Sequence, residues 1–150
     1  MLDVEKILKK YNLKYRIINL RGKAISAEDV IENSIDKVNE NEIFKTIIVV
    51  GKDKNKYAFL VNRYRMVDFG KVKEIVGSKV RLANEEELKE EGFEPGNVCP
   101  ILVKIPLFVD EEFLKFKKFN CGSGDLKHGL EMNTKDLKKV KVYNVVDVKK

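Results

Sequence analysis

Three segments of this 150-residue sequence hold residues whose types and spacing could do chemistry. The first is centred on Lys45, which interrupts the apolar and β-branched run at 43–50. An ammonium in such a run is costly to bury unless it reaches a cleft, a partner or an anion. A lysine that extends from the end of a strand to water explains the pattern equally well, and the neighbouring Thr46 fits ordinary strand packing.

The second segment is the loop made of Gly96, Asn97, Val98, Cys99 and Pro100. Glycine lets a backbone approach a ligand closely, and proline stiffens the far end of the loop. Such a loop can aim N–H groups at a carbonyl that becomes an oxyanion. A purely structural turn is the alternative, and one glycine and one proline at this spacing favour the turn.

The third segment, residues 120–129, gathers a thiol, three glycines and the only histidine of the chain. Its candidate residues are Cys121, Gly122, Ser123, Gly124 and His128. The chain has neither a phosphate-binding loop string nor a dinucleotide-binding string, so nucleotide hydrolysis has no support and we expect no cofactor. The alternative for this segment is a hairpin turn followed by a surface histidine.

Cys99, Cys121 and His128 could together form a thiolate and imidazole pair or a three-ligand metal site. The two cysteines are single and lie 22 positions apart, whereas the cysteine ligands of structural zinc come in closely spaced pairs. We therefore predict no metal and two reduced thiols that behave as small buried apolar residues.

The elements that must position these segments follow from hydrophobic spacing and turn residues. We expect Ser26 with Asp29, and Asn84, to cap helices, and Gly77 to end one. The pattern predicts helices at 4–11, 27–33, 68–76, 85–91 and 135–139, and strands at 15–20, 43–50, 56–61, 79–83, 101–104, 107–109, 116–120 and 129–132. The second and third strands are expected to form a hairpin. With no repeat and no linker, the sequence predicts one α/β domain over residues 1–150 with a mixed sheet.

Composition limits the class of protein and its partners. Hydrophobic residues make up 43% and charged residues 36% of the chain, and the formal charge is +6, which favours anionic partners. The longest apolar run, 57–61, is far shorter than the roughly 20 residues that cross a bilayer, so we expect no membrane segment. The first residues lack the features of a secretory signal, so we expect a cytoplasmic protein.

Basic residues surround the second hairpin strand, and Tyr57, Tyr64 and Phe69 are interleaved with them. These lysines and arginines could meet phosphates while the rings stack on bases. A solvated, lysine-rich surface explains the charges equally well. Six of the acidic residues cluster at 85–94, which is typical of a solvated helix face.

Four strings carry a resemblance to a known family. They are a lysine–threonine strand at 44–47, a strand-to-helix junction at 80–88, a GxxxP loop at 96–100, and a closing strand with a glycine turn at 119–124. In this order they resemble the YbaK family of aminoacyl-tRNA deacylases, also found as the editing domain inserted in some prolyl-tRNA synthetases. The resemblance spans most of the chain. It implies a mixed, mostly antiparallel and partly barrel-like sheet flanked by short helices.

The resemblance also implies an activity, which is hydrolysis of the ester between a wrong amino acid and the terminal adenosine of a tRNA, commonly the tRNA for proline. Lys45 would then position the substrate electrostatically, and the backbone of Gly96, Asn97, Val98, Cys99 and Pro100 would surround the scissile carbonyl. Thr46, Cys121, Gly122, Ser123, Gly124 and His128 would contact the substrate. The implied partners are the acceptor end of an aminoacyl-tRNA and prolyl-tRNA synthetase, with no metal and no cofactor.

No protein nucleophile is required, because a positioned water, the terminal ribose hydroxyl or the substrate's own side chain could attack an activated ester. Cys99 and the pair Ile101 and Leu102 depart from the family pattern, so the amino acid removed is not read from the sequence. Two alternatives stay open. One is a non-catalytic tRNA-binding module that works with a synthetase, and the other is a hydrolase of small esters or thioesters that uses Cys99, Cys121 and His128.

Overall fold

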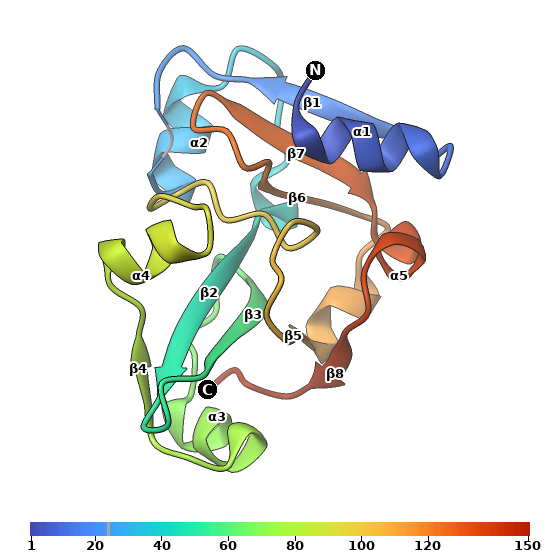
Figure 1. The fold of residues 1–150 in the computed structure, drawn as a ribbon. Coiled ribbons are helices and arrows are strands. Elements are labelled where there is room, and N and C mark those ends of the chain that lie inside the picture. The colour runs from blue at the N-terminus through green and yellow to red at the C-terminus, as the bar shows by residue number, and fades with distance from the viewer. Residues whose placement is uncertain (24) are drawn as a thin grey trace.

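A computed structural model describes residues 1–23 and 25–150, and its strands form two open sheets (Figure 1). The smaller sheet is antiparallel and has the order β1-β7-β6, with β1 at Tyr15–Asn19, β7 at His128–Asn133 and β6 at Lys118–Gly122. The larger sheet has the order β4-β2-β3-β5-β8. Its strands are β4 (Val80–Leu82), β2 (Phe44–Gly51), β3 (Lys56–Asn62), β5 (Leu107–Asp110) and β8 (Asn144–Val146).

The larger sheet is mixed, which confirms the predicted α/β class. β2 pairs antiparallel with both β3 and β4, whereas β5 is parallel to β3 and to β8. The two sheets meet at an isolated parallel bridge between Ile43 and Asn120. Both sheets keep free edge strands, so the arrangement is two joined open sheets, without the closure that defines a barrel.

Short helices flank the sheets, as the sequence predicts. Ser26 Oγ accepts the N–H of Asp29, Asn84 Oδ1 accepts the N–H of Glu87, and Gly77 ends a helix with a φ of 80°. The helices are α1 (Asp3–Lys10), α2 (Ala27–Asn33), α3 (Phe69–Val76), α4 (Glu85–Glu90) and α5 (Leu137–Val140), with 3-10 turns η1 (Glu40–Glu42), η2 (Glu111–Lys115) and η3 (Thr134–Asp136).

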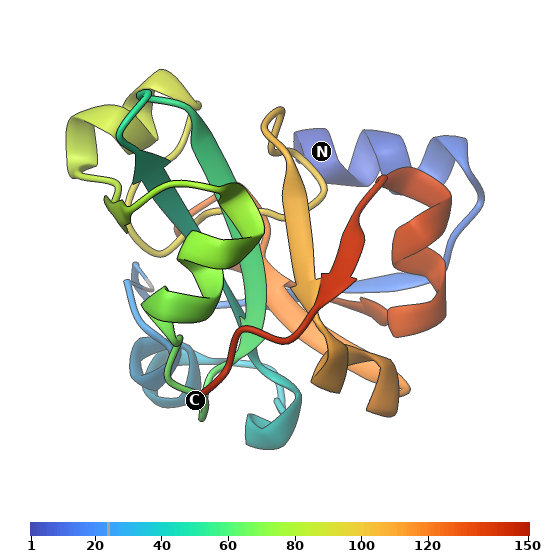
Figure 2. The ribbon, with the colours of Figure 1, turned by 90° about the horizontal axis from the view of Figure 1, so that it is seen from below.

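The apolar side chains gather in two main clusters, one on each face of the β2–β3 hairpin, because side chains alternate along a strand. On one face Phe44 packs edge to face against Phe113 and Phe119, and α1 adds Val4 and Leu8 to the same cluster. On the other face, α3 covers the sheet (Figure 2), and its Val72 belongs to the second cluster. The hairpin is therefore held from both sides, which fixes its ends.

Three strand predictions need correction. The strand expected at 101–104 is wrong, since the N–H groups of Leu102 and Val103 both bond to the Cys99 carbonyl and make a turn. This turn still buries Ile101 and Val103, which explains the misleading apolar pattern. The strand expected at 116–120 lies two residues later, at Lys118–Gly122, and β8 was not predicted.

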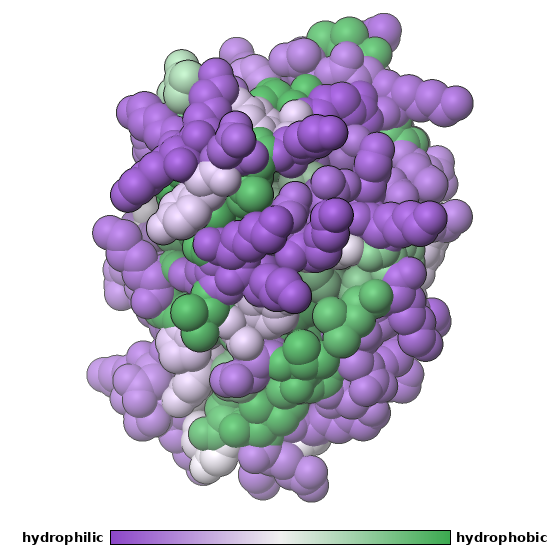
Figure 3. Space-filling view, turned by 90° about the vertical axis from the view of Figure 1, so that its right-hand side faces the viewer, coloured by the Kyte–Doolittle hydropathy of each residue, from purple (hydrophilic) through white to green (hydrophobic). Residues whose placement is uncertain are grey.

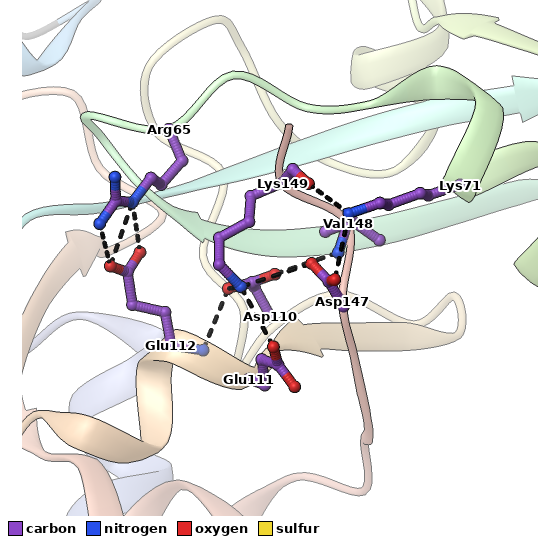
Figure 4. Close-up of polar contacts among 8 residues, drawn as sticks. All are labelled: Arg65, Lys71, Asp110, Glu111, Glu112, Asp147, Val148 and Lys149. Atoms are coloured by element: carbon purple, nitrogen blue, oxygen red, sulfur yellow. Dashed lines mark hydrogen bonds and ion pairs between the residues drawn. The ribbon is translucent and has the colours of Figure 1, made fainter.

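A buried carboxylate fastens the C-terminal segment to the end of β5 (Figure 4). Asp110 is 1% exposed; its Oδ1 accepts the N–H of Val148 at 3.1 Å, and its Oδ2 accepts the N–H of Glu112 at 3.0 Å. The Lys149 ammonium lies 3.3 Å from the same carboxylate. Asp110 thus caps η2 and holds the last residues at once.

The surface is mainly polar and charged on the face that carries α1, α5 and β8, and an apolar strip crosses its lower half (Figure 3). Leu114, Val142 and Val145 are exposed apolar residues of the segments on this side. Of the helices within residues 1–23 and 25–150, none has the length and apolar character that spanning a bilayer demands.

Candidate functional site

A cavity of about 390 Å³ lies where the two sheets meet. Its floor is the face of the smaller sheet that carries Asn120 and two glycines, Gly122 and Gly129, which face each other in β6 and β7. α2 lies over the cavity and contributes Ala27 and Val30. A Cβ on Gly122 would collide with the 96–100 loop and one on Gly129 would press on Ile18, so glycine at both positions lets neighbouring segments pack closely against the floor.

Lys45 enters this cavity near the start of β2, where it pairs with Val61 of β3. Among the described residues its ammonium has neither a hydrogen bond nor an ion pair, and partial burial lowers the pKa of Lys45. The sequence left a solvated strand-end lysine and a cleft lysine equally open. The structure places this one in the cleft, as an unpaired cation that attracts an anion or developing negative charge.

The 96–100 loop reaches the cavity through Gly96 and Val98. Gly96 has a φ of 92°, a left-handed conformation that favours glycine. Gly122 lies directly behind the loop, since a Cβ on it would stand 2.4 Å from the Val98 carbonyl oxygen. Gly124 N–H donates to the Asn97 carbonyl, and Asn97 Nδ2 donates to the Gly124 carbonyl, each at 3.0 Å. The loop is therefore fastened to the glycine turn.

Three backbone donors of this loop are free. Within the described chain, the N–H groups of Gly96, Val98 and Cys99 have no hydrogen-bond acceptor, whereas that of Asn97 bonds to Glu94. Cys99 and Pro100 are buried and do not line the cavity. Asn97, Cys99 and Pro100 therefore support the loop, and Gly96 and Val98 are the members that can meet a ligand.

The glycine turn divides in the same way. Cys121, Gly122 and His128 line the cavity, but Ser123 and Gly124 do not. The Ser123 hydroxyl donates to the His128 carbonyl at 2.6 Å and so shapes the turn. His128 Nδ1 lies 3.0 Å from a carboxylate oxygen of Asp125, another cavity residue. This contact orients the imidazole and leaves Nε2 for a ligand or a water.

The thiols do not form the pair that a Cys/His hydrolase needs. Cys99 is fully buried, and neither thiol is hydrogen-bonded to His128 in residues 1–23 and 25–150. Burial raises the pKa of Cys121, which keeps this thiol protonated and a poor nucleophile. The described residues contain no group of three His, Cys, Asp or Glu side chains that could hold a metal ion.

Sequence reasoning missed part of the cavity wall. Four buried side-chain polar atoms in the described chain have no hydrogen-bond partner: Thr46 Oγ1, Arg63 Nη1 and both amide atoms of Asn120. All three residues line this cavity. Buried polar groups are nearly always hydrogen-bonded, so these atoms form a polar part of the cavity wall that water or a ligand can meet. Thr46 was predicted; Asn120 lay in the third segment without a role, and no local motif distinguished Arg63 from its basic neighbours.

Comparison with known proteins agrees with this geometry. The model of the aminoacyl-tRNA editing domain family matches residues 26–140, and no curated protein matches the chain. The solved structure of the hypothetical protein APE2540 is 29% identical, with a TM-score of 0.86 over 98% of this chain and 99% of that one. A protein provisionally described as a trans-editing enzyme for prolyl-tRNA synthetase is 25% identical, with a TM-score of 0.82 over 98% of this chain and 94% of its own.

The family match covers more than half of the sequence and includes Lys45, the 96–100 loop and the glycine turn. The fold agrees with that of the two solved structures along almost the whole chain. This chain therefore belongs to the aminoacyl-tRNA editing domain family, and it is an aminoacyl-tRNA deacylase, a hydrolase that acts on carboxylic ester bonds.

Proposed function

We propose that this protein removes a wrongly attached amino acid from the tRNA for proline, and that Lys45 and the backbone of the 96–100 loop bind the reacting ester. The observation that carries the proposal is the meeting of Lys45, Gly96, Val98 and Gly122 around one cavity. The choice of tRNA is supported by the solved structure described in relation to prolyl-tRNA synthetase, which is also the partner we propose.

The chemistry needs little from the protein beyond placement and charge. Water adds to the ester carbonyl and forms a tetrahedral oxyanion. The free N–H groups of Gly96 and Val98 can donate to this oxygen, and one such donor contributes about 10²- to 10³-fold in kcat. The carbon–oxygen bond to the ribose then breaks, and the ribose oxygen takes up the proton that the nucleophile lost. With water as nucleophile, the products are the free amino acid and the uncharged tRNA.

The cavity matches this substrate in size and polarity. Pockets that hold small ligands measure roughly 300–1,000 Å³, and this one has about 390 Å³. Leu20, Val30 and Leu130 give it an apolar wall for an amino acid side chain. Such a wall discriminates by only about 1–3 kcal/mol per methylene, so we expect several small amino acids to be released at different rates.

The test is release of amino acid from a panel of mischarged tRNAs. We expect release from the tRNA for proline, and we expect Lys45→Met to lower kcat/KM by about 10²-fold or more without changing the melting temperature. Lys52→Met, which removes an exposed lysine from the hairpin turn, is the matched control and should retain full activity. Intact protein that binds tRNA but releases no amino acid from any member of the panel would favour the non-catalytic module instead.

A further inference from the structure

Arg63 follows β3 and stands on the same face of the hairpin as Lys45. Its N–H donates to the Ile43 carbonyl at 2.9 Å, which continues the register in which Lys45 pairs with Val61. Arg63 and Lys45 are therefore diagonal neighbours across the strand pair, a relation in which the two residues lie about 7–8 Å apart. Both line the cavity, so two cations approach one ligand from adjacent strands.

The guanidinium of Arg63 has an ion-pair partner and an aromatic neighbour, and one of its terminal nitrogens lacks a hydrogen-bond acceptor among the described residues. The side chain is only 10% exposed, and its Nη2 pairs with Glu28 of α2, the helix over the cavity. The guanidinium carbon lies 4.5 Å from the centre of the Tyr64 ring, a cation–π contact that fixes its plane. Nη1 is buried and has no hydrogen-bond partner among the described residues. A charged donor that is sealed in this way lacks an acceptor which a ligand can supply.

The ligand group that best fits Arg63 is a phosphate. An arginine fork binds phosphate through two parallel hydrogen bonds, and a lysine adds a point charge beside it. Three other basic side chains around the hairpin have acidic partners outside the cavity: Lys56 pairs with Glu90, Arg65 with Glu112 and Lys71 with Asp147. Arg63 is the one of these four that lines the cavity.

We propose that Arg63, beside Lys45, is a phosphate-binding residue, and that it takes the phosphate of the tRNA's terminal nucleotide in exchange for Glu28. The inference rests on the proposed function, because an RNA acceptor end brings a phosphodiester on the 5′ side of the adenosine whose ribose carries the ester. Glu28 is 68% exposed, so its carboxylate can return to water when the phosphate replaces it. Until then it keeps the guanidinium at the cavity and preserves the position of α2.

The main experiment compares a substrate that has this phosphate with one that lacks it. With aminoacyl-tRNA, Arg63→Gln should raise KM about ten- to a hundredfold, the usual effect of losing a charged hydrogen bond. With aminoacyl-adenosine, which carries no phosphate, kcat/KM should be unchanged. The matched control is Arg65→Gln, which removes the same charge two residues away and outside the cavity, and should leave KM for tRNA near that of the unaltered protein. Equal losses on both substrates, or no loss on tRNA beyond that of Arg65→Gln, would overturn the proposal.

Two further variants test the exchange with Glu28. Glu28→Gln should lower KM for aminoacyl-tRNA, because the phosphate no longer competes with a carboxylate. Glu32→Gln removes the same charge one turn further along α2, where it makes no ion pair within the described residues, and should have a smaller effect. Arg63→Lys should recover part of the affinity while the melting temperature stays constant. If Glu28→Gln raises KM as much as Arg63→Gln does, Glu28 only orients the arginine and the exchange is wrong.

A binding measurement separates this inference from the proposed function. Adenosine 5′-monophosphate carries the phosphate without the ester, and calorimetry should show tighter binding to the unaltered protein than to Arg63→Gln, with adenosine bound equally by both. If the unaltered protein binds the nucleotide through Arg63 but hydrolyses no ester, only the proposed function fails. If it hydrolyses esters and Arg63→Gln binds the nucleotide as tightly as the unaltered protein, only the present proposal fails.

Discussion

A single methyl group at Gly122 should disable the enzyme without unfolding it. The Cβ of Gly122→Ala would stand 2.4 Å from the Val98 carbonyl oxygen and 2.9 Å from the Asn97 carbonyl carbon. Carbon and oxygen ordinarily meet at about 3.3 Å, so the loop must retreat by roughly 0.9 Å. Both neighbouring atoms belong to the backbone, and the paired hydrogen bonds between Asn97 and Gly124 resist this movement.

The expected loss of stability is small, whereas the expected loss of catalytic rate is large. Overpacking of this kind costs about 1–3 kcal/mol, which is less than the 5–15 kcal/mol that stabilises an ordinary domain. The protein should therefore fold, with a melting temperature lower by roughly 2–12 °C. A displacement near 1 Å of a group that positions the substrate costs about 10²-fold in rate. We thus expect kcat for deacylation of tRNA to fall about a hundredfold while the circular dichroism spectrum is retained.

The control is Gly22→Ala, because a Cβ there would meet nothing within 4 Å. This variant should match the unaltered protein in both melting temperature and deacylation rate. A Gly122→Ala protein with full activity and an unchanged melting temperature would show that the loop does not depend on close contact with β6. The assignment of its N–H groups to the oxyanion would then lose its structural basis.

Three other perturbations have clear expected outcomes. Asp110→Asn should lower the unfolding free energy in urea by about 1–3 kcal/mol, because an amide cannot accept all the donors that the carboxylate holds. Replacing Cys99 and Cys121 together by alanine should leave deacylation measurable, because Cys99 does not line the cavity, and burial raises the pKa of Cys121 and keeps that thiol protonated. Arg81 holds the pKa of Glu87 at about 2. The Arg81–Glu87 pair therefore stabilises the fold above the unfolded pKa of about 4.3, and this stabilisation is lost as the pH falls toward 2. Glu87→Gln should reduce this loss of unfolding free energy in urea titrations at pH 5 and pH 3.

Each of these has an outcome that would contradict it. An unchanged urea midpoint for Asp110→Asn would mean that the C-terminal segment adds little to stability. Complete loss of activity in a folded double alanine variant would restore the cysteine hydrolase as an explanation. An acid limb of the same slope with and without Glu87 would show that the ion pair with Arg81 is weak in solution.

The sequence predicted most elements because their signals are local. The cap made by Ser26 and Asp29, the left-handed Gly77 and the alternation in the hairpin each depend on a few neighbouring residues. The failures have a different origin. Residues 101–104 are apolar because they are buried in a turn, and burial alone does not distinguish a turn from a strand. β8 pairs with β5, more than 30 positions earlier in the chain, and its three residues carry too little pattern to be recognised.

The candidate site was predictable where a backbone conformation or an odd charge marked it. Lys45 stood out as a cation in an apolar strand, and Gly96 as a glycine in a stiffened loop, and both line the cavity. Arg63 and Asn120 could not be recognised in this way, because their unpaired polar atoms are a property of packing between distant segments. The roles assigned to all these residues remain predictions that the variants above can test.

The pairing of β1 with β7 joins residues 15–19 to residues 128–132, so the floor of the cavity combines segments that lie far apart in the sequence. Contacts so distant in sequence form late during folding, because a long loop must close before they are made. A nascent chain on the ribosome therefore has no cavity floor until β7 has been synthesised. A truncated product that stops before β7 lacks this floor and should neither bind nor hydrolyse a charged tRNA at this site.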